Sequence, residues 1–257
     1  MAIDFNFARF LISCRHCGVS FRDTITLGRL NSYIGIKETR RLIEWGNLDE
    51  SRCRKILNYD ESRHAEPFFE VLGARTVDSM DASGFEGATV VHDLNLPITE
   101  ALKGRFDVVC DAGTIEHVMN FPTAIRNCME MVRVGGHLIL GTPANNFFGH
   151  GFYQFSPELW FRLFSPAQGF RVIRIVAVEY GPRSRWFEVT DPEMVRERVE
   201  LTNRYPVLLM VLAEKTAEVA LFQTYPQQSD YVPRWKGAGD PSSRRSARRR
   251  GCRWPPR

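Results

Sequence analysis

The chain has 257 residues, of which 44% are hydrophobic and 25% are charged, and its net charge is +4. This length is enough to bury one substantial core, and the composition is ordinary for a soluble globular protein. No apolar run approaches the roughly 18 residues that a membrane span requires. The first residues, MAIDFNFARFLISC, include an acid and no basic leader, so we expect a cytoplasmic protein without a membrane segment.

The positive charge is concentrated at the C-terminal end. Residues 236–257 hold Lys236 and seven arginines against Asp240, a charge of +7 that leaves about −3 for the rest of the chain. Because this end has too few apolar residues to form a core, we predict a disordered basic tail over 231–257. The tail could bind nucleic acid nonspecifically. The mildly acidic remainder argues against a specific nucleic-acid-binding face.

The six cysteines are scattered and do not suggest a disulfide framework. Only Cys14 and Cys17, in CRHC, have the spacing of metal ligands, and no second pair follows to complete four ligands. Ordinary thiols are therefore favoured over structural zinc at this pair, and we expect no metal site.

Apolar runs that alternate with helical patterns predict a parallel sheet covered by helices. In chain order, the sequence predicts a helix over 37–45, a helix over 65–72 that ends at Gly73, strands at 74–81, 88–93 and 106–111, a helix over 121–134 that stops at Gly135-Gly136, a strand at 137–142, a helix from Ser156-Pro157, a strand at 170–179, a helix from Asp191-Pro192, and a strand at 206–215. We divide the chain into an N-terminal helical and loop extension (1–52), a main domain (53–230) and the tail.

One more strand is needed before residue 74. A parallel pair requires a crossover of a dozen or more residues, and the stretch between 74–81 and 88–93 is too short for one. We therefore expect these two strands not to pair directly, and we place a short, degenerate first strand at 55–58. The segment around it, KILNYDESRHAEPFF, contains no glycine.

Polar residues stand at the ends of consecutive predicted strands. They are Asp81, Asp93, Asp111 and Thr142, with Glu116-His117 and Asn145-Asn146 shortly downstream. In open parallel sheets, ligands bind outside the carboxyl ends of the strands. The pattern therefore indicates a polar, ligand-binding rim along one edge of the sheet.

The stretches that carry this rim, VDSMDAS, ATVVHDLNLP, FDVVCDAGTIEHVMNFP and MEMVRVGGHLILGTPANN, resemble class I S-adenosylmethionine-dependent methyltransferases. The chain is most similar to a methyltransferase-like group that shares TLGR, LGA, HDLN and NNFFGHGFYQFSPE. The resemblance covers about residues 53–215. It implies an α/β fold with a Rossmann-like, mostly parallel sheet, helices on both faces and an antiparallel edge strand, which the resemblance places at 170–179.

The resemblance also implies roles for single residues. Asp81 would bind the ribose hydroxyls of S-adenosylmethionine and Asp93 the adenine amine, while Asp111 and Glu116 would lie on the lip of the cofactor cleft. An acidic rim suits the cationic sulfonium. The glycine-rich loop that such enzymes carry after the first strand is missing from 53–65.

Two histidines are candidates for catalysis. His150 lies between glycines in ANNFFGHGFYQFSPE, and histidine is the residue type that most often acts as a general base, so we expect it to take this role. His117 is the second candidate. Alternatively, His150 only orders its loop, and Glu116-His117 orients the cofactor, starts a helix or, together with Asp111, holds a divalent ion.

We therefore expect S-adenosylmethionine-dependent methyl transfer to oxygen or nitrogen of a small-molecule acceptor, such as a sugar or a secondary metabolite. The alternative is a non-catalytic binding or scaffold protein that kept the fold and lost the cofactor loop. A nicotinamide dehydrogenase is disfavoured because GxGxxG is absent.

Overall fold

A computed structural model describes residues 2–53, 56, 64–195 and 198–231, and an eight-stranded sheet forms its centre. The strands lie in the order β5-β4-β2-β6-β7-β10-β8-β9. Their bounds are β2 Asp23–Leu27, β4 Thr76–Asp81, β5 Val90–Val91, β6 Phe106–Ala112, β7 Val132–Pro143, β8 Phe170–Glu179, β9 Arg185–Glu188 and β10 Val207–Lys215. All pairs from β5 to β7 are parallel, whereas β10 and β9 run against their neighbours. A separate two-stranded sheet joins β1 (Ala2–Ile3) to β3 (Asn31–Ser32).

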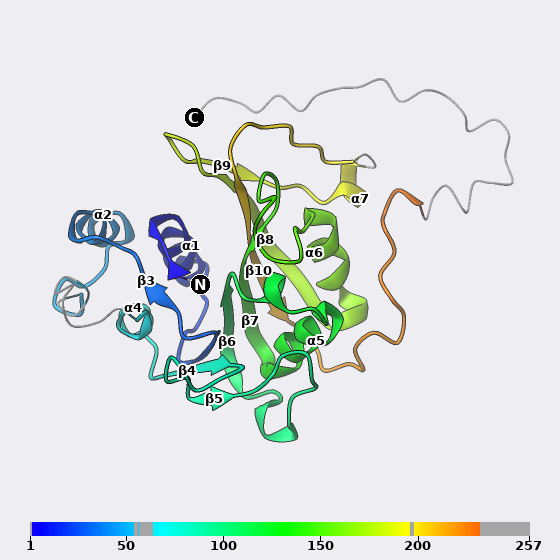
Figure 1. The fold of residues 1–257 in the computed structure, drawn as a ribbon, viewed down its shortest axis with the longest axis horizontal. Coiled ribbons are helices and arrows are strands. Elements are labelled where there is room, and N and C mark those ends of the chain that lie inside the picture. Colours follow the sequence, from blue (N-terminus) through cyan, green and yellow to red (C-terminus); the bar gives the residue numbers. More distant parts are fainter. Residues whose placement is uncertain (1, 54–55, 57–63, 196–197, 232–257) are drawn as a thin grey trace, which may run out of the picture.

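Helices cover both faces of the large sheet (Figure 1). One face carries α1 (Phe5–His16), α2 (Ile36–Gly46) and α4 (Glu66–Leu72), and the other carries α5 (Phe121–Met131) and α6 (Pro157–Leu163). The short helices α7 (Pro192–Val195), η1 (Glu100–Leu102), η2 (Ile115–His117) and η3 (Pro166–Gln168) lie in the connections.

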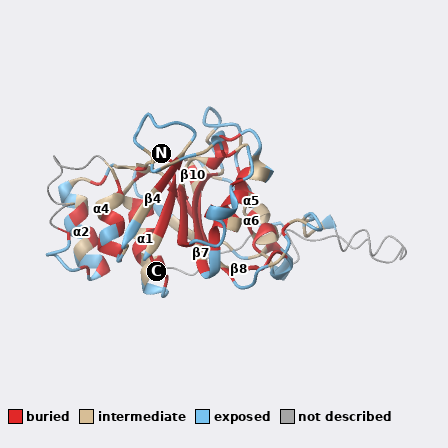
Figure 2. Ribbon diagram, turned by 90° about the horizontal axis from the view of Figure 1, so that it is seen from below, coloured by how far each residue is buried: buried red, intermediate tan, exposed pale blue. Residues whose placement is uncertain are grey.

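The central strands are buried between two separate hydrophobic cores (Figure 2). Along β6, Val108 and Cys110 belong to the core under α1 and α4, whereas Val109 belongs to the core under α5 and α6. This alternation follows from the two-residue period of a strand. It also explains why the strand is apolar throughout, as strands of covered parallel sheets are.

The structure confirms the mostly parallel sheet with helices on both faces. Six of the seven predicted strands are present, together with the helices expected at 37–45 and 65–72. Gly73 ends α4 with a left-handed φ of 106°, and α6 begins at Pro157 directly after its N-cap Ser156. Sequence reasoning missed α1, which begins after the N-cap Asp4; the Asp4 carboxylate accepts a hydrogen bond from the Phe7 amide at 2.8 Å.

The predicted position of the first strand is wrong. Of residues 55–58 only Ile56 is described, and the place between β4 and β6 belongs to β2. Both α2 and α4 lie between β2 and β4 in the chain. The first strand of the sheet therefore lies much farther before β4 than the predicted position at 55–58. The expected boundary between 52 and 53 is therefore also wrong, because a strand from residues 1–52 forms the middle of the sheet.

The expected separation of the second and third strands is wrong as well. β4 and β5 pair directly and in parallel, with Asp81 opposite Val91. β5 is only two residues long, and the connection turns tightly at Gly87, whose φ is 74°. A full helical crossover is therefore not needed to bring so short a strand into register.

Two further boundaries differ from the prediction. α5 ends at Met131, and Gly135 and Gly136 lie inside β7. A Cβ at Gly136 would lie 2.9 Å from the carbonyl oxygen of Asp107, so this glycine permits the close approach of β7 to β6. The strand at 170–179 is not the edge of the sheet, because the chain turns back after it and adds β9 outside it in antiparallel orientation.

No helix in the described ranges is long and apolar enough to cross a membrane. The basic tail predicted at 231–257 lies, from residue 232 onward, outside the described residues.

Candidate functional site

The order of the strands reverses at the carboxyl end of β2. The chain runs from β2 outward to β4 and β5, then returns to β6 and β7 on the other side of β2. Asp81 ends β4 on one side of this point, and Ala112 ends β6 on the other. In open α/β sheets such a switch point is where ligands bind.

The ends of these strands are tied to one another by hydrogen bonds. Directly after β2, Gly28 adopts a left-handed φ of 70°, and its amide donates to the carbonyl of Met80 at 2.6 Å. On the other side, the Thr114 hydroxyl donates to the carbonyl of Leu27 at 2.8 Å. Sequence reasoning missed Gly28 as a site residue, although the TLGR stretch that contains it was the available signal.

Asp81 and Asp93 follow the neighbouring strands β4 and β5. Asp81 is half-buried, and its carboxylate accepts the amide of Ser83 at 3.1 Å. Asp93 is exposed and accepts the amide and the side-chain NH₂ of Asn95 at 2.9 and 2.8 Å. These two hydrogen bonds hold the pKa of Asp93 below its usual value. Both acids thus lie on the β4–β5 side of the switch point.

Asp111, near the end of β6, shapes the loop that follows it. Its carboxyl group is fully buried and accepts the amides of Thr114 at 2.8 Å and Ile115 at 3.4 Å. Burial raises the pKa of Asp111, and the nearby charge of Glu116 raises it further. These contacts start the turn of η2, so the side chain positions the residues that η2 carries.

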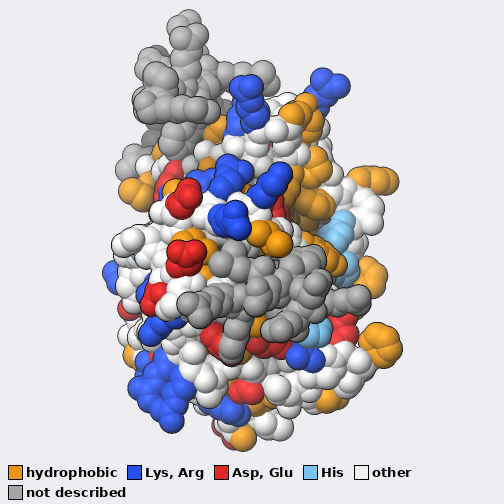
Figure 3. All heavy atoms as spheres, turned by 90° about the vertical axis from the view of Figure 1, so that its left-hand side faces the viewer, with side chains coloured by type: hydrophobic (Ala, Val, Ile, Leu, Met, Phe, Trp, Pro, Cys, Tyr) orange, Lys and Arg blue, Asp and Glu red, His pale blue; other side chains and the backbone are white. Residues whose placement is uncertain are grey.

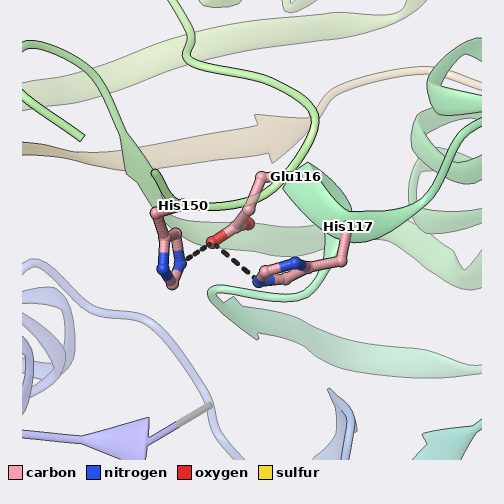
Figure 4. Close-up of side chains that lie close together, drawn as sticks. All are labelled: Glu116, His117 and His150. Carbon is pink, nitrogen blue, oxygen red and sulfur yellow. Dashed lines mark hydrogen bonds and ion pairs between the residues drawn. The ribbon is translucent and has the colours of Figure 1, made fainter. Parts of the chain in front are cut away.

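Glu116, His117 and His150 form one cluster at the ends of β6 and β7 (Figure 4). Glu116 Oε1 lies 3.3 Å from His150 Nε2 and 4.0 Å from His117 Nε2. The two imidazole rings meet edge to face, with their centroids 4.9 Å apart. Only 1% of the Glu116 side chain is exposed, whereas both histidine side chains are 48% exposed. The cluster therefore sets a buried carboxylate behind two accessible imidazoles.

The environment changes the protonation of this cluster. Burial raises the pKa of Glu116 and lowers that of His117, and the neighbouring His150 lowers the pKa of His117 further. His117 is therefore neutral at physiological pH, which leaves an imidazole nitrogen with a free lone pair.

The loop after β7 holds His150 against Glu116. The amides of Phe152 and Tyr153 donate to the carbonyl of Glu116 at 2.7 and 3.3 Å. Gly151 has a φ of 68°, and a Cβ there would lie 2.9 Å from Glu116 Cγ. This tight contact, which only glycine permits, joins loops that are 34 residues apart in the chain.

The structure thus brings together Asp111, Glu116, His117 and His150, and it places Asp81 and Asp93 farther along the same edge of the sheet. A surface hollow of about 510 Å³ lies elsewhere, between α1 and α2, where it is lined by Phe5, Arg9, Arg41, Leu42, Glu44 and Trp45. On that side of the molecule basic side chains gather among hydrophobic ones (Figure 3). The hollow is separate from the strand-end site.

No protein-family model and no curated protein matches the chain. Similar solved structures include the N-methyltransferase NodS of Bradyrhizobium japonicum in complex with S-adenosyl-L-homocysteine, at 12% identity and a TM-score of 0.46, covering 82% of this chain and 87% of NodS. TehB of Haemophilus influenzae has 12% identity and a TM-score of 0.41, covering 79% of this chain and 61% of TehB. A branched-chain polyamine synthase of Thermus thermophilus in complex with N4-aminopropylspermidine and 5′-methylthioadenosine has 12% identity and a TM-score of 0.43, covering 87% of this chain and 60% of the synthase.

The chain therefore spans about three fifths of the length of TehB and of the polyamine synthase. These likenesses are partial and concern fold alone. The chemistry of the site rests on its own residues.

Proposed function

We propose that this protein transfers a methyl group from S-adenosylmethionine to an oxygen or nitrogen of a small-molecule acceptor. The observation that carries the proposal is the set of carboxylates around the switch point of the sheet. Asp81 lies on one side of the β2 end and Glu116 on the other. A dinucleotide or nucleoside cofactor that lies across the strand ends would meet both sides.

The residues on the β4–β5 side suit the adenosine half of the cofactor. A ribose diol donates two hydrogen bonds, and the Asp81 carboxylate at the end of a strand is a suitable acceptor. Asp93, two residues beyond β5, would accept from the adenine amine. The left-handed turn at Gly28 lets the backbone after β2 approach the cofactor closely.

The residues on the β6–β7 side suit the acceptor. S-adenosylmethionine supplies an activated methyl group, so the protein has to align the acceptor and remove one proton. His150 would accept that proton, oriented by Glu116 Oε1 at 3.3 Å, with His117 as the second candidate base. Phe148 and Phe152 are exposed in the same loop and offer apolar surface to the acceptor.

A non-catalytic binding protein is the second candidate, and one observation favours it. A single glycine follows β2 where a glycine-rich loop would be expected. The next residue, Arg29, donates hydrogen bonds to the Glu66 carboxylate at 2.7 Å and to the carbonyl of Glu86 at 2.9 Å. If the intact protein does not bind the cofactor, the non-catalytic binding protein would be the favoured function.

Asp81→Ala tests the proposed cofactor site. The change removes the acceptor for the ribose hydroxyls, so cofactor affinity should fall by about tenfold or more, corresponding to roughly 1.4 kcal/mol. The melting temperature should hardly change, because within the described part of the chain the Asp81 carboxylate has a single, local hydrogen bond, from the Ser83 amide. Calorimetric titration with S-adenosylhomocysteine measures the affinity.

Asp78→Ala is the matched control, because Asp78 lies on the same strand and forms a surface ion pair with Arg105. The control should keep the wild-type affinity. Equal affinity of Asp81→Ala and the wild type would remove Asp81 from the site.

A further inference from the structure

The carboxylate of Glu116 is incompletely satisfied in a buried position. Its Oε2 atom is buried and lacks a hydrogen-bond partner among the described residues. Its Oε1 atom faces two imidazole nitrogens that carry a full positive charge only when protonated. A buried carboxylate without a compensating charge is costly, so a bound cation would stabilise this group.

We propose that Glu116, His117 and His150 bind one divalent transition-metal ion. One oxygen of Glu116 and one nitrogen of each imidazole lie within 4.8 Å of one another. Ligand atoms at about 2.0–2.2 Å from a tetrahedral ion lie roughly 3.4 Å apart. The 3.3 Å and 4.0 Å separations from Glu116 Oε1 are already close to that value. Small rotations of the half-exposed rings would complete the site.

The donor set indicates the class of metal. Two imidazoles and one carboxylate suit Zn²⁺, Fe²⁺ or Co²⁺ better than Mg²⁺ or Ca²⁺, which prefer oxygen ligands alone. Three protein ligands leave at least one coordination position open, as in metal sites that act on a substrate. Cys14 and Cys17 do not form a competing pair, because Cys14 is buried and Cys17 is exposed.

The backbone around the carboxylate leaves room for such an ion. Gly113 has a φ of 95°, and a Cβ there would lie 3.1 Å from Glu116 Oε1, the oxygen that faces both histidines. Gly151 allows the loop after β7 to press against the other side of Glu116. The two glycines keep side chains away from the carboxylate while they hold His150 within reach of it.

A bound ion would also define the acceptor. An open position beside His117 and His150 would take an oxygen of the acceptor, and coordination lowers the pKa of a hydroxyl group. In the metal-bound protein His150 would be a ligand, so this coordination, and not His150 as the base, would promote loss of the proton. The preferred acceptors would then be hydroxyl compounds that can coordinate a metal. This last step rests on the proposed methyl transfer, whereas metal binding itself does not.

Titration of the metal-free, untagged full-length protein with Co²⁺ tests the metal site. We expect one equivalent to bind with the visible absorption of four- or five-coordinate Co²⁺, without a thiolate charge-transfer band, and to be displaced by Zn²⁺. His117→Ala and His150→Ala should each weaken binding by at least about 100-fold, because each removes a direct ligand. Both rings are half exposed, so the variants should fold, and His150→Gln provides a second variant at that position.

His92→Gln and Cys17→Ser are the controls, and both should bind Co²⁺ as the wild type does. Absence of a saturable Co²⁺ spectrum, or wild-type affinity in the variants at His117 and His150, would overturn the metal site and leave a simple Glu–His pair. Neither cofactor nor acceptor is present in this titration, so its failure is distinct from failure of the proposed methyl transfer.

Discussion

Glu116→Gln is expected to raise the melting temperature of the metal-free protein. Burial raises the pKa of the Glu116 carboxyl group, and its Oε2 atom has no hydrogen-bond partner in the described structure. A buried charge costs more than a buried neutral amide, and glutamine removes the charge at nearly constant volume. A gain of about 1 kcal/mol shifts the melting temperature of a domain of this size by roughly 2–4 °C.

The same variant should lose its response to metal. A ligand that binds only the folded state stabilises it, so Zn²⁺ should raise the melting temperature of the wild type and leave that of Glu116→Gln unchanged. Differential scanning calorimetry with and without Zn²⁺ measures both effects. Glu100→Gln is the control, because the Glu100 side chain is 87% exposed and the change should have little effect. A lower melting temperature in Glu116→Gln would show that the carboxylate stabilises the fold.

Trp160→Ala is expected to destabilise the protein by about 3–5 kcal/mol, the usual cost of deleting a large buried aromatic side chain. Trp160 is fully buried and packs against Phe155 and Phe164, with ring centroids at 5.1 and 5.8 Å. Phe155 in turn anchors the loop after β7, since its amide donates to the carbonyl of Pro143 at 2.8 Å. The change should therefore also loosen the loop that carries His150.

Urea denaturation measures the free energy of unfolding of this variant. Phe148→Ala is the matched control, because Phe148 belongs to the same loop but is 100% exposed, and its removal should change stability by less than about 0.5 kcal/mol. If Trp160→Ala lowers the free energy of unfolding by less than about 1 kcal/mol, this aromatic cluster does not hold the loop.

The apolar strands were predictable because their pattern is local. The run FDVVCDA alone indicates a strand buried on both faces, and the structure confirms it as β6. By contrast, β2 has only five residues, DTITL, two of which are buried threonines. Nothing local distinguishes such a segment from a loop in an N-terminal extension. Its central place depends on pairing with β4 and β6, which is a long-range property.

The residues of the candidate site were predictable as a group, but their mutual geometry was not. The positions of Glu116 and His150 after neighbouring strands placed both at one edge of the sheet. The 3.3 Å contact between them depends on the left-handed turn at Gly151 and on hydrogen bonds from Phe152 and Tyr153 to the carbonyl of Glu116. The near-complete burial of Glu116 follows from the same loop. Asp111 illustrates the converse, since a carboxylate expected at the lip of the cleft is turned toward its own loop.

Calorimetric titration of the full-length protein with S-adenosylhomocysteine tests the central claim most directly. Binding of one equivalent with a Kd in the micromolar range, about −8 kcal/mol, is the result we predict, and the Asp81→Ala variant should weaken it. Such binding would establish that the strand ends around Asp81 and Gly28 hold the cofactor, although a single glycine follows β2 in place of a glycine-rich loop. Absence of binding at millimolar ligand would contradict methyl transfer and indicate a binding protein built on the same sheet.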